Sequence, residues 1–230
     1  MRNYLRTGLI AIAVTFVFGG FAATAANAQI NEILKRMDDH YKLLKTVRTN
    51  VTYEKYESGL DDTTSRKGKA IYALQKGKNP LIRIDWTKPE ESLAVIDKKY
   101  IVYQPKLKQA FRGSTDNVKD KNSSGVSSPL AFINMSKEQL KANYSIKYIG
   151  EEKVNGTTPT WHLELTPKTA QKYKLADIWV DGNGMPIQMK ITANNNDTET
   201  VLLTGLEKNI SIKGSVFEIN PPKGTKYIDN

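Results

Sequence analysis

The chain has 230 residues and a formal net charge of +10, because 34 Lys and Arg residues outnumber 24 Asp and Glu residues. It contains no cysteine, which excludes disulfide bonds, thiolate metal sites, a cysteine nucleophile and a lipidated N-terminal cysteine. A basic surface suits anionic lipid headgroups or nucleic acid, although the same charge also serves solubility.

The first 28 residues have the pattern of a secretory signal peptide. Arg2 and Arg6 precede an apolar run from Leu9 to Phe18, and the small-residue motif Ala26-Asn27-Ala28 follows. The run is too short for a membrane-spanning helix. We therefore expect cleavage after this motif, export to the periplasm, and a mature chain, residues 29–230, that folds as one domain. Export makes nucleic acid an unsuitable partner.

A helix and then a series of short strands are predicted for the mature chain. Apolar residues from Ile30 to Val47 recur at three- and four-residue spacing, as in an amphipathic helix. From Thr49 the period changes to two, and strand-like segments then recur in the rhythm of an antiparallel meander. In the first half of the chain we expect strands at 49–56, 70–74, 81–86, 93–96, 100–103 and 110–111.

The middle of the chain interrupts this series. Residues 113–128 have no apolar pattern, which predicts a loop that serves as a lid or linker. Ser136 and Gln139 have the spacing of a capping box, so a short helix to about Asn143 is expected. The proline-containing tail from Val216 is expected to be extended. Strands are expected again at 144–151, 160–167, 175–180, 186–192 and 198–206, which gives one α+β domain with ten or eleven antiparallel strands.

Residue types that carry catalysis are scattered along the chain. His40 and His162 have no Cys or second His at metal-ligand spacing, and we expect both to face solvent. Paired carboxylates such as Glu90-Glu91 and Glu151-Glu152 fall at expected turns. The turn Asp181–Gly184 has only part of a calcium-loop pattern. We expect no enzymatic activity, metal or cofactor, although the carboxylates leave a hydrolase of envelope polymers as an alternative.

The alternating strands carry more apolar surface than the expected helices can cover. All three tryptophans, Trp86, Trp161 and Trp179, fall in strand-like segments. A large antiparallel sheet either packs as a filled sandwich or curls around a space that holds an apolar ligand. The pattern alone leaves both arrangements open.

Several motifs resemble those of LolA, a family of periplasmic lipoprotein carriers. The C-terminal "VFEINPPKGT" is similar to the family's closing motif, and "IWVDGNGMPIQMKI" from Ile178 also resembles a family segment. Two positions depart from the family: Asn79 stands where the best-known members have an arginine that helps to latch the lid, and Asp97-Lys98 replaces an Asp-Gly turn. The central motif has the family's order and spacing at Pro80, Arg83, Trp86, Pro89, Ala94–Asp97, Tyr103, Pro105 and Gln109.

The resemblance implies an open antiparallel half-barrel of about eleven strands, covered by an N-terminal helix and short mid-chain lid helices. Acyl chains of a lipoprotein or lipid would lie between sheet and lid. It also implies a monomeric carrier without a cofactor, which receives cargo from an inner-membrane ABC transporter and delivers it to an outer-membrane acceptor. Relatives on this fold include envelope-stress sensors, so a regulatory module that binds a membrane protein is the alternative.

The predicted site combines an apolar wall on the sheet with an apolar lid face. For each residue an ordinary place in the core is the simpler alternative, because alternation marks a buried face without showing what covers it. The expected wall is Ile82, Ile84, Trp86, Val95, Ile101, Tyr103, Trp161, Leu163, Leu165, Met189 and Ile191. The expected lid face is Leu34, Met37, Tyr41, Phe132 and Ile133.

Overall fold

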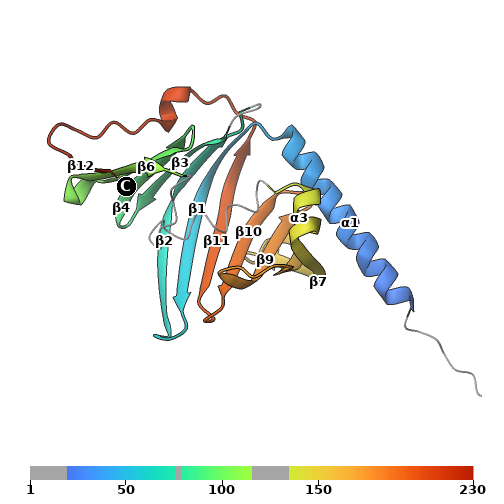
Figure 1. Cartoon of the computed structure of the whole chain (residues 1–230). Helices are drawn as coiled ribbons and strands as arrows, with labels where there is room; N and C mark the ends of the chain where they lie inside the picture. Colours follow the sequence, from blue (N-terminus) through green and yellow to red (C-terminus); the bar gives the residue numbers. More distant parts are fainter. Residues whose placement is uncertain (1–19, 76–78, 116–134, 230) are drawn as a thin grey trace, which may run out of the picture.

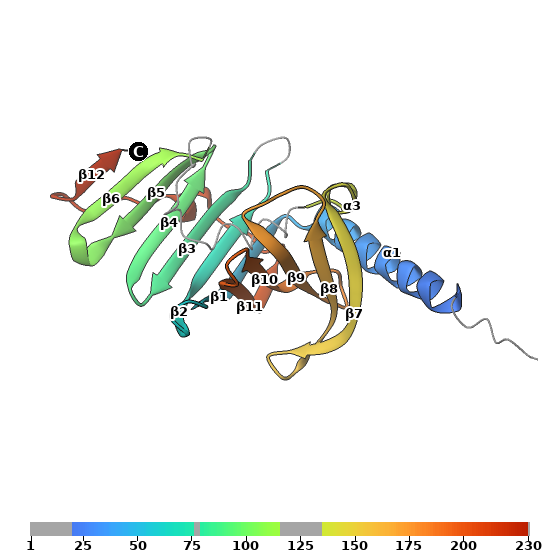
Figure 2. The ribbon, with the colours of Figure 1, turned by 60° about the horizontal axis from the view of Figure 1, so that its bottom comes forward.

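A single curved, open sheet of twelve strands dominates the structure (Figure 1 and Figure 2). The coordinates are a computed structural model that describes residues 20–75, 79–115 and 135–229. In this part of the chain the helical elements are α1 (Gly20–Leu43), η1 (Pro105–Leu107), α3 (Lys137–Asn143) and η3 (Gly214–Phe217). The strands are β1 (Thr46–Glu57), β2 (Asp62–Ala73), β3 (Leu81–Thr87), β4 (Glu90–Ile96), β5 (Lys99–Gln104), β6 (Gln109–Ser114), β7 (Tyr144–Val154), β8 (Thr158–Pro167), β9 (Tyr173–Asp181), β10 (Pro186–Ala193), β11 (Thr198–Lys208) and β12 (Lys226–Asp229).

The strand order is β12-β6-β5-β4-β3-β2-β1-β11-β10-β9-β8-β7. Neighbours are antiparallel except at one edge, where β12 pairs with β6 in parallel. The predicted α+β half-barrel is therefore confirmed, with one strand more than expected. The tail was predicted to be extended without being counted as a strand, and β12 forms there because it begins beyond both prolines, Pro221 and Pro222.

Two predicted boundaries are wrong near the N-terminus of the sheet. Val47 belongs to β1 and not to the helix, because α1 ends at Leu43 and the chain pairs with β2 and β11 from there on. β2 begins at Asp62, well before the predicted Ala70, because its polar first half continues the ladder with β1. The predicted cleavage site after Ala28 falls within α1.

α1 is amphipathic and packs against one half of the sheet. Ile33 and Leu34 are fully buried and Met37 is nearly so, whereas Lys35 and Arg36 are exposed on the other side. α3 lies beside it, and the predicted capping box is confirmed: Ser136 accepts from the backbone N–H of Gln139, whose side chain accepts from the backbone N–H of Ser136. Among the described residues no helix has both the length and the apolarity that a bilayer span requires.

We call the face of the sheet that packs against α1 the inner face, and the opposite face the outer face. Gly68 lies on the inner face of β2, and a Cβ there would be 2.3 Å from the backbone oxygen of Asp85 on β3. The two strands therefore approach closely at this position, which requires glycine.

The C-terminal segment crosses the outer face before it returns as β12 (Figure 1). Arg83 on β3 holds it, because its guanidinium donates to the backbone oxygens of Val216 (3.3 Å) and Glu218 (2.7 Å). The same guanidinium is paired with Asp85, which fixes its direction.

Candidate functional site

The inner face of β2 to β6 is a continuous apolar surface. Strand pairing sets its composition, since side chains directly opposite each other share a face. Ala70 faces Ile84, Ile84 faces Leu93, and Leu93 faces Val102 across successive strands. The residues two positions along each strand share this face. The whole surface comprises Ala70, Tyr72, Ile82, Ile84, Leu93, Val95, Val102 and Phe111.

Most of this apolar surface is only half-buried. Ile84 is covered, but Ile82, Leu93, Val95 and Val102 all keep partial exposure. The helices α1 and α3 lie at the other half of the sheet, beside β7 (Figure 2). A half-exposed apolar face of this extent, next to a filled core, is a place where an apolar ligand gains by binding.

The predicted wall divides into three groups in the structure. Ile82, Ile84, Trp86 and Val95 lie on the inner face of β3 and β4, as expected for a wall. A second group belongs to the buried cluster that contains α1, so that α1 occupies the space beside it; its members are Leu163, Leu165, Met189 and Ile191. Trp161 lies at the edge of this cluster, with the guanidinium of Arg36 5.1 Å from its ring centre.

Ile101 and Tyr103 form the third group, and their expected place in the wall is corrected. Ile101 pairs with Ala94, and Tyr103 pairs with Ser92, so both side chains point to the outer face. The reason is that β5 reads Tyr-Ile-Val-Tyr and is apolar on both faces. In such a strand, the alternation of apolar and polar residues cannot show which side chains point to the inner face.

The predicted lid face is present in part. Leu34 and Met37 are buried against the sheet, and Tyr41 is half-buried one turn further on. Phe132 and Ile133, together with most of the predicted loop 113–128, lie outside the described residues.

A row of polar side chains, which the sequence did not predict, borders the apolar surface at one end of the inner face. Arg66 on β2 lies over the ring of Trp86 at 4.6 Å and donates to Glu91 on β4 at 2.9 Å. Gln104 on β5 donates to the other oxygen of Glu91 at 2.8 Å. The Nε of Arg66 is buried without a hydrogen-bond partner among the described residues.

The polar row continues across β1 onto β11. Burial raises the pKa of the Glu199 carboxyl, against the opposing effect of nearby Lys55. Burial also raises the pKa of the Tyr53 hydroxyl, whose ring lies near that of Trp86. A hollow of about 440 Å³ adjoins this end, lined by Lys55, Ile191 and Glu199 among others. The inner face is thus amphipathic along its strands, apolar at one end and polar at the other.

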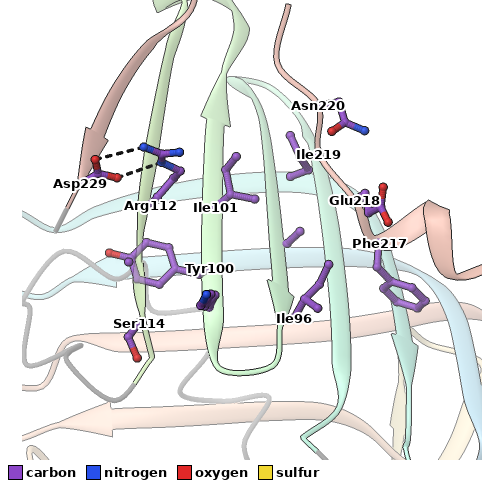
Figure 3. Close-up of a pocket in the computed structure, with 13 residues that line it drawn as sticks. Ile96, Tyr100, Ile101, Arg112, Ser114, Phe217, Glu218, Ile219, Asn220 and Asp229 are labelled. Atoms are coloured by element: carbon purple, nitrogen blue, oxygen red, sulfur yellow. Dashed lines mark hydrogen bonds and ion pairs between the residues drawn. The ribbon is translucent and has the colours of Figure 1, made fainter.

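The outer face has a separate groove between β4–β6 and the C-terminal segment (Figure 3). Its volume is about 540 Å³, and Ile96, Ile101 and Phe217 contribute apolar walls. Arg112 on β6 spans one side through two hydrogen bonds to Asp229 on β12, at 2.9 and 3.1 Å (Figure 3). The positive and negative charges of this pair are both satisfied.

His162 also lies on the outer face, but it is not solvent-exposed as expected. Its ring stacks on Trp179 at 4.3 Å, and its two nitrogens are each 2.8 Å from a carboxylate oxygen, of Glu152 and Asp177. Burial lowers the pKa of His162, but these two hydrogen bonds raise it by more. Within the described ranges no three His, Cys, Asp or Glu side chains gather as a metal site would require.

His40 is likewise covered and not solvated as expected. It is half-buried on α1, and its Nε2 is buried without a hydrogen-bond partner in the described part of the chain. Burial lowers its pKa, and the neighbouring charge of Lys208 lowers it further.

Together the open sheet, the half-exposed inner face and the flanking helix define an open α+β half-barrel. The family model for the outer membrane lipoprotein carrier protein LolA matches residues 58–220, from the end of β1 to the C-terminal segment. The chain belongs to the LolA family. The expected resemblance is therefore confirmed over most of the chain.

One solved structure shares the fold at low sequence identity, and others are similar to a smaller extent. An uncharacterized conserved protein from Thermus thermophilus is 12% identical, with a TM-score of 0.55 over 89% of this chain and 99% of that one. A DUF1329 family protein from Desulfovibrio piger is 16% identical (TM-score 0.47, 83% and 96% covered). The Mycobacterium tuberculosis lipoprotein LppX is 12% identical (TM-score 0.49, 82% and 100% covered). No curated protein matches the chain by sequence.

Proposed function

We propose that this protein is a non-enzymatic carrier that shelters the acyl chains of a lipoprotein or lipid against the inner face of β2–β6. The observation that carries the proposal is the half-buried apolar surface of Ile82, Leu93, Val95 and Val102. Family membership supports the same role. Cargo would cover the part of this surface that is now exposed.

The driving force for such binding is ample. Burying one methylene is worth about 0.8 kcal/mol, so a single long acyl chain supplies more than a carrier needs. Release is the harder requirement. A half-open surface holds an acyl chain less firmly than a closed cavity would.

The polar row could contact the polar part of the cargo, to which the acyl chains are attached. Acyl chains on the apolar end of the inner face would direct the attached glycerol or peptide toward Arg66, Glu91 and Gln104. Hydrogen-bonding groups at this end can replace the water that the linkage loses.

The cellular setting of the proposal is the bacterial periplasm. The signal-like residues 1–28 and the family support export. Cargo would pass from an inner-membrane ABC transporter to an outer-membrane acceptor. Asn79, in place of the family's latch arginine, is exposed two residues before β3, so lid closure would depend on other contacts.

Two adjacent residues of β5 provide the test. Val102 lies on the inner face and Ile101 on the outer face, and both are half-buried. Binding of dansyl-labelled undecanoic acid, followed by fluorescence, should fall about tenfold or more in Val102→Glu, because a charge would lie against the acyl chain. Ile101→Glu should bind as the parent does.

Equal loss in both variants, or no binding by the folded parent, would contradict the proposal. Circular dichroism of both variants checks that the sheet is intact. Native mass spectrometry of the exported protein should in addition detect acyl cargo.

A further inference from the structure

An exposed patch at one corner of the sheet combines basic and apolar side chains. We call it the η1 patch, and it comprises Lys106, Leu107, Lys108, Lys223, Lys226 and Tyr227. It lies where β5 turns into β6 and where β12 begins, at the left of the sheet in Figure 1. All six side chains are exposed.

The pairing of β12 brings the two parts of the patch together. The backbone N–H of Lys226 donates to the backbone oxygen of Lys108 at 2.8 Å, and Tyr227 pairs with Ala110 on β6. Pro105 opens the turn, and the backbone N–H of Lys108 closes it by donating to the Pro105 oxygen at 3.1 Å. The backbone of the η1 patch is therefore ordered without a partner, which lowers the entropy cost of binding.

The charge of the patch is of one sign. The sequence has no Asp or Glu from 98 to 115 or from 219 to 228. The nearest acid along β12, Asp229, is paired with Arg112, and the guanidinium of Arg112 also lies 4.4 Å from the ring centre of Tyr227. Four lysines thus lie near Leu107 and Tyr227 along the chain, and the acids that begin β4 beside η1 are Glu90, which is exposed, and Glu91, which is paired with Arg66.

The apolar members of the patch are unusually open. Leu107 is 63% exposed in its turn, and Tyr227 is 44% exposed on β12, where it pairs with Ala110. Leu60 is similarly exposed, at 74%, on the β1–β2 hairpin, but Asp61 and Asp62 follow it there. The two hairpin tips therefore share an open leucine and differ in charge.

We propose that the η1 patch docks the protein on the surface of a bilayer that contains anionic phospholipid. Leu107 enters the boundary between headgroups and acyl chains, Tyr227 lies at headgroup level, and the lysines contact lipid phosphates. Lysine stems cover apolar surface while their charges stay in water, which suits the places on either side of Leu107. An acidic protein surface or a nucleic acid would bind the lysines but would offer no apolar environment for the side chain of Leu107.

The position of the patch links it to the inner face. η1 and β12 lie at the edge of the sheet next to β5 and β6, whose inner side carries Val102 and Phe111. A bilayer at this corner would meet the polar end of the inner face, where Gln104 precedes η1, and the apolar surface begins two positions further along each strand, at Val102 and Phe111. Docking does not depend on cargo binding, and each can be measured without the other.

Flotation with lipid vesicles tests the proposal on the exported protein, in the form in which cells accumulate it. The protein should float with vesicles of phosphatidylcholine and phosphatidylglycerol and not with phosphatidylcholine alone. Leu107→Ser and the double variant Lys106→Glu/Lys226→Glu should each reduce the bound fraction about tenfold or more. The binding of the parent should weaken as salt is raised.

Two matched controls distinguish the patch from the rest of the molecule. Leu60→Ser removes an equally open leucine, and Lys67→Glu/Lys69→Glu reverses two exposed lysines of β2. Both controls should float as the parent does. Failure of the parent to float, or equal losses in control and test variants, would overturn the proposal, even if acyl probes still bind normally.

Discussion

The backbone of Gly184, in the β9–β10 turn, lies directly against the backbone of Arg36 on α1. A Cβ at position 184 would be 2.2 Å from the Arg36 oxygen, and Gly184 has a φ of +86°. Arg36 also donates to the backbone oxygen of Gly182 at 3.1 Å. This contact fixes where α1 crosses the sheet, and thereby which half of the inner face the helix covers.

Gly184→Ala should destabilise the protein strongly, by more than about 2 kcal/mol, because both the positive φ and the missing space oppose a side chain. Urea unfolding followed by circular dichroism measures the change. Gly182→Ala in the same turn is the control, because nothing lies within 4 Å of a Cβ there. Similar losses in the two variants would show that α1 does not depend on this contact.

Arg66→Met should destabilise the protein by about 1–3 kcal/mol, because Glu91 would lose a charged hydrogen-bond partner while largely buried. The double variant Arg66→Met/Glu91→Gln should recover part of the loss. A double-mutant cycle from urea unfolding gives the coupling between the two side chains. Additive losses would mean that the polar row is not a connected unit.

His162 should make stability depend on pH. Burial lowers its pKa and the carboxylates of Asp177 and Glu152 raise it by more, so its folded pKa lies above the unfolded value of 6.5. The stabilisation is then complete below the unfolded pKa and is lost as pH rises through the folded one. His162→Gln should therefore lower the free energy of unfolding more at pH 6 than at pH 9.

His40 is present in both proteins of this comparison, so its own titration cancels. The expected difference at pH 6 is about 1–3 kcal/mol, as for hydrogen bonds to charged groups. Urea unfolding of parent and variant at several pH values measures it. A difference that stays constant from pH 6 to pH 9 would contradict an ionised His162 between its two carboxylates.

Local sequence signals predicted much of the fold. The capping box of Ser136 places α3, and the spacing of apolar residues predicts α1. Asn155 and Gly156 both adopt positive φ and form the turn expected between β7 and β8. β12 was missed because a four-residue parallel strand depends on a partner far along the chain and carries no local signal.

The candidate site was harder to predict because it depends on strand register. The β4 segment Leu93–Ile96 and the β5 segment Tyr100–Tyr103 are apolar on both faces, so their phase came only from pairing. The polar row joins Arg66, Glu91 and Gln104, which are far apart in sequence and meet across strands. No spacing of residues along the sequence predicts that these three side chains lie together.

Photo-crosslinking with a diazirine-bearing fatty acid tests the central claim most directly. After irradiation and proteolysis, mass spectrometry should place the adducts on inner-face residues of β3, β4 and β5, namely Ile82, Leu93, Val95 and Val102. Adducts confined to the outer-face groove at Ile96, Ile101 and Phe217, or none in the folded protein, would contradict the account.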